Sequence, residues 1–249
     1  MKSKFLNRKR MKKLFLLLLI IFPLFTIAQG KIAWDFNLKP GAQEWKLLKS
    51  NQEKVDVCQI PTHLLTELET KELLDICLNY PLLPDIFAFN NVEDGFIKFE
   101  KDFNGFRELI TRNDAMNELL ILYTQTDPSA IPINTTIIEK GNYVLKISFI
   151  ELFASHTSVT NKSTTKIKKE FVKELVLKNS KKKLKPEWYN SIGTQTNFLS
   201  LVKIIKSDTD SFNSKLNNSE LTSFIYTRNI LPSLIQDLIN EVANEYLTK

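Results

Sequence analysis

The stretch PTHLLTELETKELLDICLNYP at residues 61–81 decides the fold class of this chain. Its large aliphatic residues recur three or four positions apart, which is the period of an amphipathic α-helix with one buried face. The residues of this face are Leu64, Leu65, Leu68, Leu73, Leu74 and Ile76. Pro81 ends the pattern, because a proline lacks the backbone N–H and clashes with the preceding turn. The spacing therefore predicts a helix over residues 62–80, with a break near Thr70.

The same period continues on both sides of this stretch. Ser50 and Glu53 have the spacing of a capping box, in which each side chain accepts a hydrogen bond from the other residue's backbone N–H. Further helices are predicted over residues 82–89, 92–103, 105–123, 143–156, 164–179, 186–206 and 219–246. Pro232 either kinks the last of these or begins a new first turn.

Glycine is scarce, with only six in 249 residues. This scarcity argues against an all-β sandwich, which needs many tight turns. The predicted fold class is therefore all-α. We expect an irregular antiparallel helical array, which either closes into a globule or stacks in a solenoid-like manner.

The N-terminus has the three parts of a secretory signal peptide. Residues 2–13 hold seven cations and no acid, and an apolar run follows at residues 14–27. This run is shorter than the roughly 20 residues that a membrane-spanning helix needs. Small residues at Thr26 and Ala28 predict cleavage between Ala28 and Gln29, and hence export to the periplasm or the medium. The alternative is an uncleaved N-terminal anchor, whereas a lipoprotein would need a cysteine in place of Gln29.

Cleavage would change the charge of the chain. The full sequence has 34 Lys plus Arg and 28 Asp plus Glu, but seven of the cations precede Gln29, so 27 cations remain against 28 acids. The sequence pI of about 9.1 therefore belongs to the precursor, and it gives no reason to expect a nucleic-acid partner. After cleavage no transmembrane helix is expected.

The distribution of charge and a group of helix-breaking residues divide the remaining chain into two halves. Residues 29–130 carry 10 cations and 17 acids, whereas residues 131–249 carry 17 cations and 11 acids. Pro128, Pro132 and Gly141 interrupt the helical period between these halves, where residues 131–138 allow a short extended piece. We expect a signal peptide at 1–28, an N-terminal extension at 29–44, an acidic helical half at 45–127, a linker at 128–142 and a basic helical half at 143–249. Residues 45–249 are expected to form one compact unit.

Lysines are densest between residues 162 and 185. Those at 162, 166, 169 and 173 recur at helical spacing beside an apolar face of Ile167, Phe171, Leu175 and Val176, which is typical of a solvated helix face. The next four, Lys181, Lys182, Lys183 and Lys185, lie beyond the clear period. These four are expected in an exposed turn before Pro186.

The two cysteines, Cys58 and Cys77, lie near the ends of consecutive predicted helices that Pro61 would fold back on each other. In an oxidising compartment they could form a disulfide, provided that their Cα atoms lie within about 7 Å. The alternative is that both are buried thiols that pack as small apolar side chains.

The sequence offers no catalytic, cofactor-binding or metal-binding motif. The only histidines are His63, expected in an exposed first turn, and His156, expected at a helix C-terminus where a cation would complement the helix dipole. Two isolated histidines do not have zinc-site spacing, and no Gly-x-Ser-x-Gly, Gly-x-Gly-x-x-Gly or P-loop pattern occurs. A carboxylate pair for glycoside hydrolysis could be drawn from Glu93, Asp94, Glu100 and Asp102, although any acidic helix offers such pairs.

Several short strings resemble an uncharacterised family of exported Bacteroidetes proteins. These strings are Cys58-Gln59-Ile60-Pro61, Cys77-Leu78-Asn79-Tyr80-Pro81-Leu82, Phe103-Asn104-Gly105 and Arg112-Asn113-Asp114-Ala115. The resemblance covers about residues 45–123. It implies export and a shared helical N-terminal half, and it implies no activity and no catalytic residue.

Two functional hypotheses follow. The first is an exported non-enzymatic helical protein that binds a protein or an envelope component, and it requires an apolar groove or concave face. The second is a hydrolase of unfamiliar type that uses paired carboxylates, drawn from Glu93, Asp94 and Asp102. It requires two of these carboxylates to converge in a deep pocket.

Overall fold

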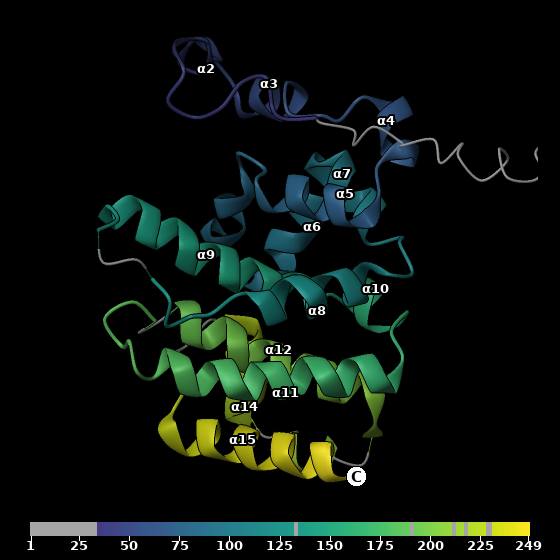
Figure 1. Cartoon of the computed structure of the whole chain (residues 1–249), viewed down its shortest axis with the longest axis vertical. Helices are drawn as coiled ribbons and strands as arrows, with labels where there is room; N and C mark the ends of the chain where they lie inside the picture. Colours follow the sequence, from purple (N-terminus) through teal and green to yellow (C-terminus); the bar gives the residue numbers. More distant parts are fainter. Residues whose placement is uncertain (1–33, 132–133, 190–191, 211–212, 217–218, 228–230) are drawn as a thin grey trace, which may run out of the picture. The chain divides into compact units, whose positions relative to one another are not determined.

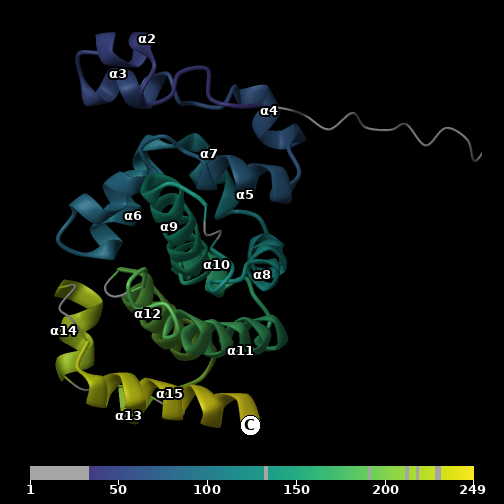
Figure 2. The same cartoon turned by 60° about the vertical axis from the view of Figure 1, so that its left-hand side comes forward.

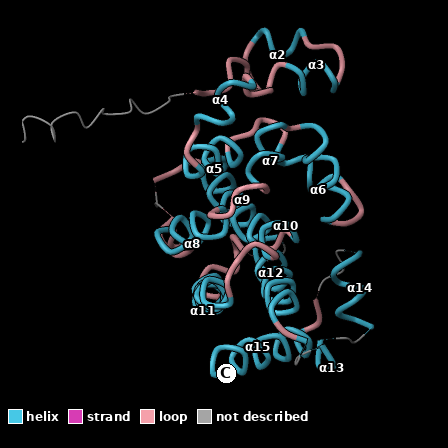
Figure 3. Tube along the Cα trace, turned by 90° about the vertical axis from the view of Figure 1, so that its right-hand side faces the viewer, coloured by secondary structure: helices cyan, strands magenta, loops and turns pink. Residues whose placement is uncertain are grey.

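The amphipathic segments of the sequence fold into helices that pack in successive layers (Figure 1). The computed structural model describes residues 34–131, 134–189, 192–210, 213–216, 219–227 and 231–249. The helices are α2 Gln43–Leu47, α3 Asn51–Asp56, α4 Thr62–Glu67, α5 Thr70–Leu78, the 3-10 helix η2 Leu83–Ala88, α6 Val92–Asp102, α7 Asn104–Leu109, α8 Ala115–Gln125, α9 Ile137–Ala154, α10 Thr157–Thr160, α11 Thr165–Lys182, α12 Ile192–Asp208, α13 Asn213–Leu216, α14 Ser219–Thr227 and α15 Ser233–Thr248. No strand occurs in these ranges (Figure 3), so the predicted all-α class is confirmed.

The layers follow the order of the chain, and residues 34–249 form one compact unit. Helix α5 packs on α7 and α8, and α8 packs on α9 and α11. Helices α11 and α12 pack on each other, and α15 packs on both (Figure 2). Helix α12 also lies along α9. The acidic and basic halves therefore share an extensive interface rather than being joined only by a linker.

Two of the short segments on which the resemblance rests, residues 58–61 and 103–105, are hydrogen-bonded to each other. The side chain of Gln59 donates to the carbonyl of Asp102 at 2.8 Å and accepts from the backbone N–H of Asn104 at 3.2 Å. Asn104 in turn accepts from the N–H of Ile60 at 3.0 Å and donates to its carbonyl at 2.7 Å. A Cβ atom on Gly105 would lie 2.7 Å from the Ile60 side chain. These residues therefore fasten the segment after α3 to the start of α7.

The predicted helix over residues 105–123 is wrong, because the structure has two helices, α7 and α8, with a turn between them. Arg112 stabilises this turn by donating to the carbonyl of Leu65 at 2.7 Å, and Asp114 accepts from Thr70 at 2.8 Å. Lys162 donates to the carbonyl of Thr111 at 2.6 Å. Lys162 thus satisfies a backbone carbonyl that a continuous helix would have paired, and the contacts of Arg112 and Asp114 fix the turn against α4 and α5.

The boundary predicted at residues 128–142 is also displaced. Thr136 and Glu139 form a capping box that starts α9 at Ile137, so Gly141 lies inside the helix, and residues 134 and 135 form a turn and a bend rather than an extended piece. Helix α12 begins at Ile192 rather than near Pro186, since residues 186–188 form a turn. Pro232 caps the new helix α15, which is the second of the two alternatives for this proline.

Candidate functional site

Helices η2 and α6 approach each other closely and form the wall of a pocket. Asn91 starts α6 by accepting a hydrogen bond from the N–H of Asp94 at 2.8 Å. Gly95, one turn later, faces η2, and a Cβ atom there would lie only 2.5 Å from the carbonyl oxygen of Ile86. The close approach therefore requires glycine at residue 95.

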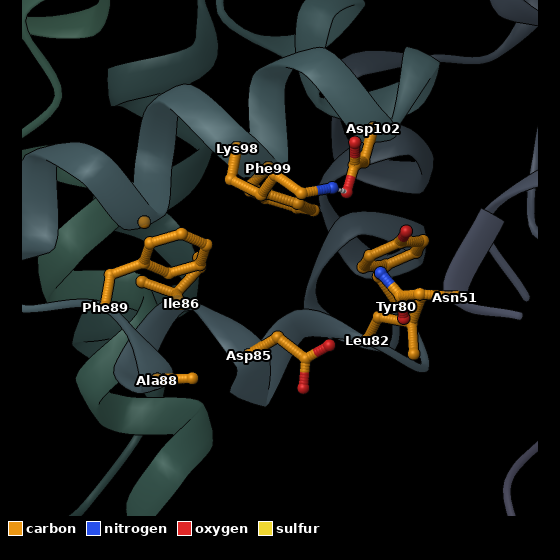
Figure 4. A pocket seen from close by; sticks show the side chains of 11 residues that line it. Asn51, Tyr80, Leu82, Asp85, Ile86, Ala88, Phe89, Lys98, Phe99 and Asp102 are labelled. Carbon is orange, nitrogen blue, oxygen red and sulfur yellow. Dashed lines mark hydrogen bonds and ion pairs between the residues drawn. The ribbon is translucent and has the colours of Figure 1, made fainter.

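The pocket has a volume of about 340 Å³. Its wall is mainly aromatic and aliphatic, with four polar side chains (Figure 4). The lining residues are Asn51, Tyr80, Leu82, Asp85, Ile86, Ala88, Phe89, Gly95, Lys98, Phe99 and Asp102. In Figure 4 the pair formed by Lys98 and Asp102 lies across the hollow from Asp85. The pocket therefore has an apolar wall between two polar edges.

The two acids of the pocket are in different electrostatic states. Asp102 forms an ion pair with Lys98, and its side chain is 14% exposed. The carboxylate of Asp85 is exposed and has no hydrogen-bond or ion-pair partner in the part of the chain that the structure describes. The pocket thus contains one neutralised acid and one uncompensated acid.

Tyr80 has an unusual place in the wall. Its side chain is only 4% exposed, and its hydroxyl has no hydrogen-bond partner among the described residues. Burial raises the pKa of Tyr80, and the nearby Cys58 and Asp85 raise it further. The hydroxyl therefore stays protonated at neutral pH, and the ring contributes a neutral aromatic face.

The pocket wall belongs to a larger set of packed rings, which we call the aromatic cluster. Its members are Phe36, Tyr80, Phe96, Phe99, Phe103, Phe106, Phe149, Phe153 and His156. Tyr80 stacks on Phe103 with 4.3 Å between ring centroids, and Phe99 stacks on Phe106 at the same separation. Because these rings support one another, Tyr80 and Phe99 are held in place on the inner side of the pocket.

A second polar assembly, which we call the Glu151 network, lies between α8, α9, α11 and α12. Lys182 Nζ lies 2.6 Å from Glu151 Oε1, and both side chains are at most 1% exposed. Tyr123 donates to the same oxygen at 2.5 Å. Thr196 donates to Oε2 at 2.6 Å, and Asn197 donates to Oε1 at 3.2 Å. Three helices, α8, α11 and α12, therefore donate to one buried carboxylate on a fourth, α9.

Burial shifts the pKa values within this network. Burial lowers the pKa of Lys182, while the neighbouring Glu151 opposes that shift. Burial also raises the pKa of Tyr123 well above its ordinary value. Thr196 is 4% exposed and Asn197 is fully buried. Because solvent does not reach these groups, the arrangement is that of a structural ion pair rather than of a substrate site.

The carboxylates considered for hydrolysis do not converge. Glu93 forms an ion pair with Lys203 of α12, Asp94 hydrogen-bonds Asn91 at 2.8 Å, and only Asp102 lines the pocket. Glu100 lines a different hollow, beside Arg107. The other acid of the pocket is Asp85, which lies in η2. It lines the same hollow as Asp102 because η2 and α6 approach each other closely at Gly95. No pattern in the sequence marked Asp85.

Both cysteines are free, fully buried thiols. Burial raises the pKa of Cys58 to about 11 and raises that of Cys77 well above its ordinary value. Of the two alternatives that the sequence left open, the structure has the unbonded thiols. Both thiols are therefore protonated at neutral pH and are poor nucleophiles.

His63 is exposed in the first turn of α4, as expected. The interpretation of His156 as a cation at a helix C-terminus is wrong. Its Nδ1 accepts from the N–H of Ser158 at 3.3 Å and caps the N-terminus of α10. Burial lowers the pKa of His156 to about 4; nearby Lys203 lowers it too, and Glu93 opposes the shift. The imidazole is therefore neutral at pH 7.

The lysine-rich segment is not wholly a solvated face. Lys182 belongs to the Glu151 network, so the prediction of an exposed turn is wrong at this residue. Helix α11 extends to Lys182, and Lys181 binds Asp127 at 2.9 Å. Lys168 is 5% exposed and pairs with Asp208 at 3.5 Å. Several of these lysines are therefore structural.

Known proteins and general site criteria add little to this geometry. No family model matches the chain, and no similar curated protein or solved structure is found. The described ranges hold no group of three or more His, Cys, Asp or Glu side chains that could bind a metal ion. Within the same ranges, no helix combines the length and apolarity needed to cross a membrane. The predicted signal peptide and its cleavage site at Ala28 and Gln29 lie outside the described residues.

Proposed function

We propose that this chain is an exported, non-enzymatic helical protein that binds a partner protein or an envelope component through the pocket between η2 and α6. The observation that carries the proposal is the pocket itself. Its volume of about 340 Å³ lies within the range of ligand sites, roughly 300–1,000 Å³. Its wall of apolar and aromatic side chains with a few polar groups also has the composition of such sites.

Rigidity of the wall supports this assignment. Phe99 and Ile86 are buried to 4% and 2% exposure, and both also pack into the protein interior. A partner group would therefore meet a preformed surface and would lose little binding free energy to reorganisation. The hydrolase hypothesis has weaker support, because Glu93 is neutralised by Lys203 and Asp94 is engaged by the α6 cap.

Export is the second part of the proposal, and it rests on the cationic and apolar segments that precede Gln29. It leads us to expect a native protein that begins at Gln29 and resides in the periplasm or the medium. Intact mass spectrometry of protein purified from its native source tests this part. A mass that includes Met1 or Met11 would contradict it.

Capture with a blocked pocket tests the binding function. Ala88→Trp places a large side chain at the exposed rim of the pocket, and Leu234→Trp is the matched control, because Leu234 is 76% exposed on α15. We expect chemical cross-linking in the native envelope to recover one identifiable partner with the wild type and with Leu234→Trp. Recovery should be lost with Ala88→Trp. An unchanged set of cross-linked products from all three proteins would contradict the proposal.

A further inference from the structure

We infer that the pocket between η2 and α6 takes a cationic group on an apolar stem, as in a lysine or arginine side chain presented by a partner protein. This inference rests on the proposed binding function and specifies the chemistry of the partner. It depends on three features of the pocket: its charge, its aromatic faces and its size.

Charge gives the sign of the ligand. Lys98 and Asp102 neutralise each other, whereas Asp85 lines the same hollow without a partner in the described ranges. The pocket therefore carries a net charge of −1. The ammonium group of Lys98 is already bound to Asp102, so an anionic ligand would have to displace an existing ion pair and would also meet Asp85. A cation, in contrast, pairs with Asp85 and leaves the existing pair intact.

The aromatic faces add to this preference. Phe89 lines the hollow and is only partly buried, and an aromatic ring attracts a cation to its negative face. The buried rings of Tyr80 and Phe99, together with Leu82 and Ile86, can cover the methylene stem of the ligand. An apolar stem and a terminal positive charge thus match two different parts of the wall.

Size restricts the ligand to one group. A volume of about 340 Å³ is at the lower end of the range for ligand pockets and accommodates one side chain rather than a folded segment. Figure 4 shows Asp85 on the edge opposite Lys98 and Asp102, with the apolar wall between these edges. Because Asp85 is exposed, the cation would sit at the mouth while the stem occupies the hollow.

Three small probes of similar shape and different charge test the inference. These are 2-phenylethylammonium, 2-phenylethanol and phenylacetate, each titrated at pH 7 into isotope-labelled protein while methyl signals are followed by NMR. We expect 2-phenylethylammonium to shift the signals of Leu82, Ile86 and Ala88. It should bind about fivefold more tightly than the alcohol, which corresponds to a cation–π contact plus an exposed ion pair. Phenylacetate should bind more weakly than the alcohol.

Asp85→Asn should reduce the affinity for 2-phenylethylammonium to that for the alcohol. Asp237→Asn removes an equal charge from the exposed surface of α15 and should change nothing. If the alcohol bound the wild type as tightly as the ammonium ion, the charge preference would be refuted while the pocket remained a binding site. If none of the probes shifted these methyl signals, both the inference and the proposed function of the pocket would be overturned.

Discussion

The Glu151 network and the aromatic cluster both include residues of helix α9, but they stabilise this helix in different ways. Glu151 and Phe153 are two residues apart, and both are fully buried. The carboxylate of Glu151 is bound by directed donors at 2.5 to 3.2 Å. Phe153 instead touches rings at 5.0 to 6.4 Å between centroids. The Glu151 network depends on hydrogen-bond donors at defined positions, whereas the aromatic cluster depends on the apolar area that its rings bury.

This difference explains where the pocket lies. Donors within hydrogen-bond distance surround the Glu151 carboxylate, and among the described members of the Glu151 network only the Oδ1 atom of Asn197 lacks a partner. Stacked rings require no such donors, so the aromatic cluster can border a hollow whose wall includes the buried rings of Tyr80 and Phe99. The comparison predicts that a conservative substitution lowers the free energy of unfolding more in the Glu151 network than in the aromatic cluster.

The largest expected effect comes from Lys182→Met, which keeps the length of the side chain and removes its charge. Glu151 would remain buried without its cation, a loss that costs about 3–5 kcal/mol. Equilibrium urea unfolding measures the change. Lys183→Met is the control, because Lys183 is exposed at the end of α11 and its replacement should cost less than about 0.5 kcal/mol.

Glu151→Gln combined with Lys182→Met removes both charges. We expect this double variant to recover a substantial part of the stability that Lys182→Met loses, because no unpaired charge stays buried. Equal losses in the free energy of unfolding for Lys182→Met and Lys183→Met would show that the protein does not depend on the specific pairing of Lys182 with Glu151.

Acid should destabilise the aromatic cluster through His156, which packs against Phe96 at 5.2 Å and Phe106 at 5.5 Å between centroids. The pKa of His156 is about 4 in the folded protein and about 6.5 in the unfolded chain. Between these values the unfolded state binds the extra proton, so stability falls as the pH falls. The expected loss between pH 7 and pH 4 is about 2–3 kcal/mol.

His156→Gln isolates this contribution, since the carboxylates of the protein titrate equally in both proteins. The free energy of unfolding of the variant should fall less steeply than that of the wild type between pH 6.5 and pH 4. Parallel pH profiles for the two proteins would mean that His156 is not held neutral by its surroundings.

A smaller effect is expected from Phe106→Leu, in the centre of the aromatic cluster. Leucine keeps most of the buried apolar volume but loses the ring contacts, which costs about 1.5 kcal/mol. The same urea experiment measures it. A loss as large as that of Lys182→Met would remove the distinction between the two regions, because the cluster would then also depend on exact partners.

Local signals in the sequence were sufficient for much of the fold. Half of the capping box predicted at Ser50 and Glu53 is present: the Glu53 N–H donates to Ser50 at 3.1 Å, but the Glu53 carboxylate accepts from the N–H of Lys49 at 2.8 Å rather than from that of Ser50. The break near Thr70 is also present, since α4 ends at Glu67 and α5 begins at Thr70. Each of these features depends on residues within one or two turns, which is why a linear pattern reveals it.

Features that depend on long-range contacts were not predicted. Lys182 stands seven residues after the buried Leu175 and so lies on the buried face of α11, but its charge indicated exposure. A lysine is buried here because Glu151 from another helix is its partner. The pocket likewise requires η2 and α6 to meet at Gly95, and no spacing in the chain encodes that approach.

The smallest expected effect tests whether α9 couples the two regions. Thr136 accepts from the N–H of Glu139 at 3.2 Å, and Glu139 accepts from the N–H of Thr136 at 2.8 Å. Thr136→Ala removes this cap and should cost about 1 kcal/mol, whereas Thr136→Ser keeps the hydroxyl and should be nearly neutral. Because α9 carries both Glu151 and Phe153, we expect the loss in a single cooperative transition, followed equally by tyrosine fluorescence and by helical circular dichroism. Two separated transitions in Thr136→Ala would show that the network and the cluster unfold independently.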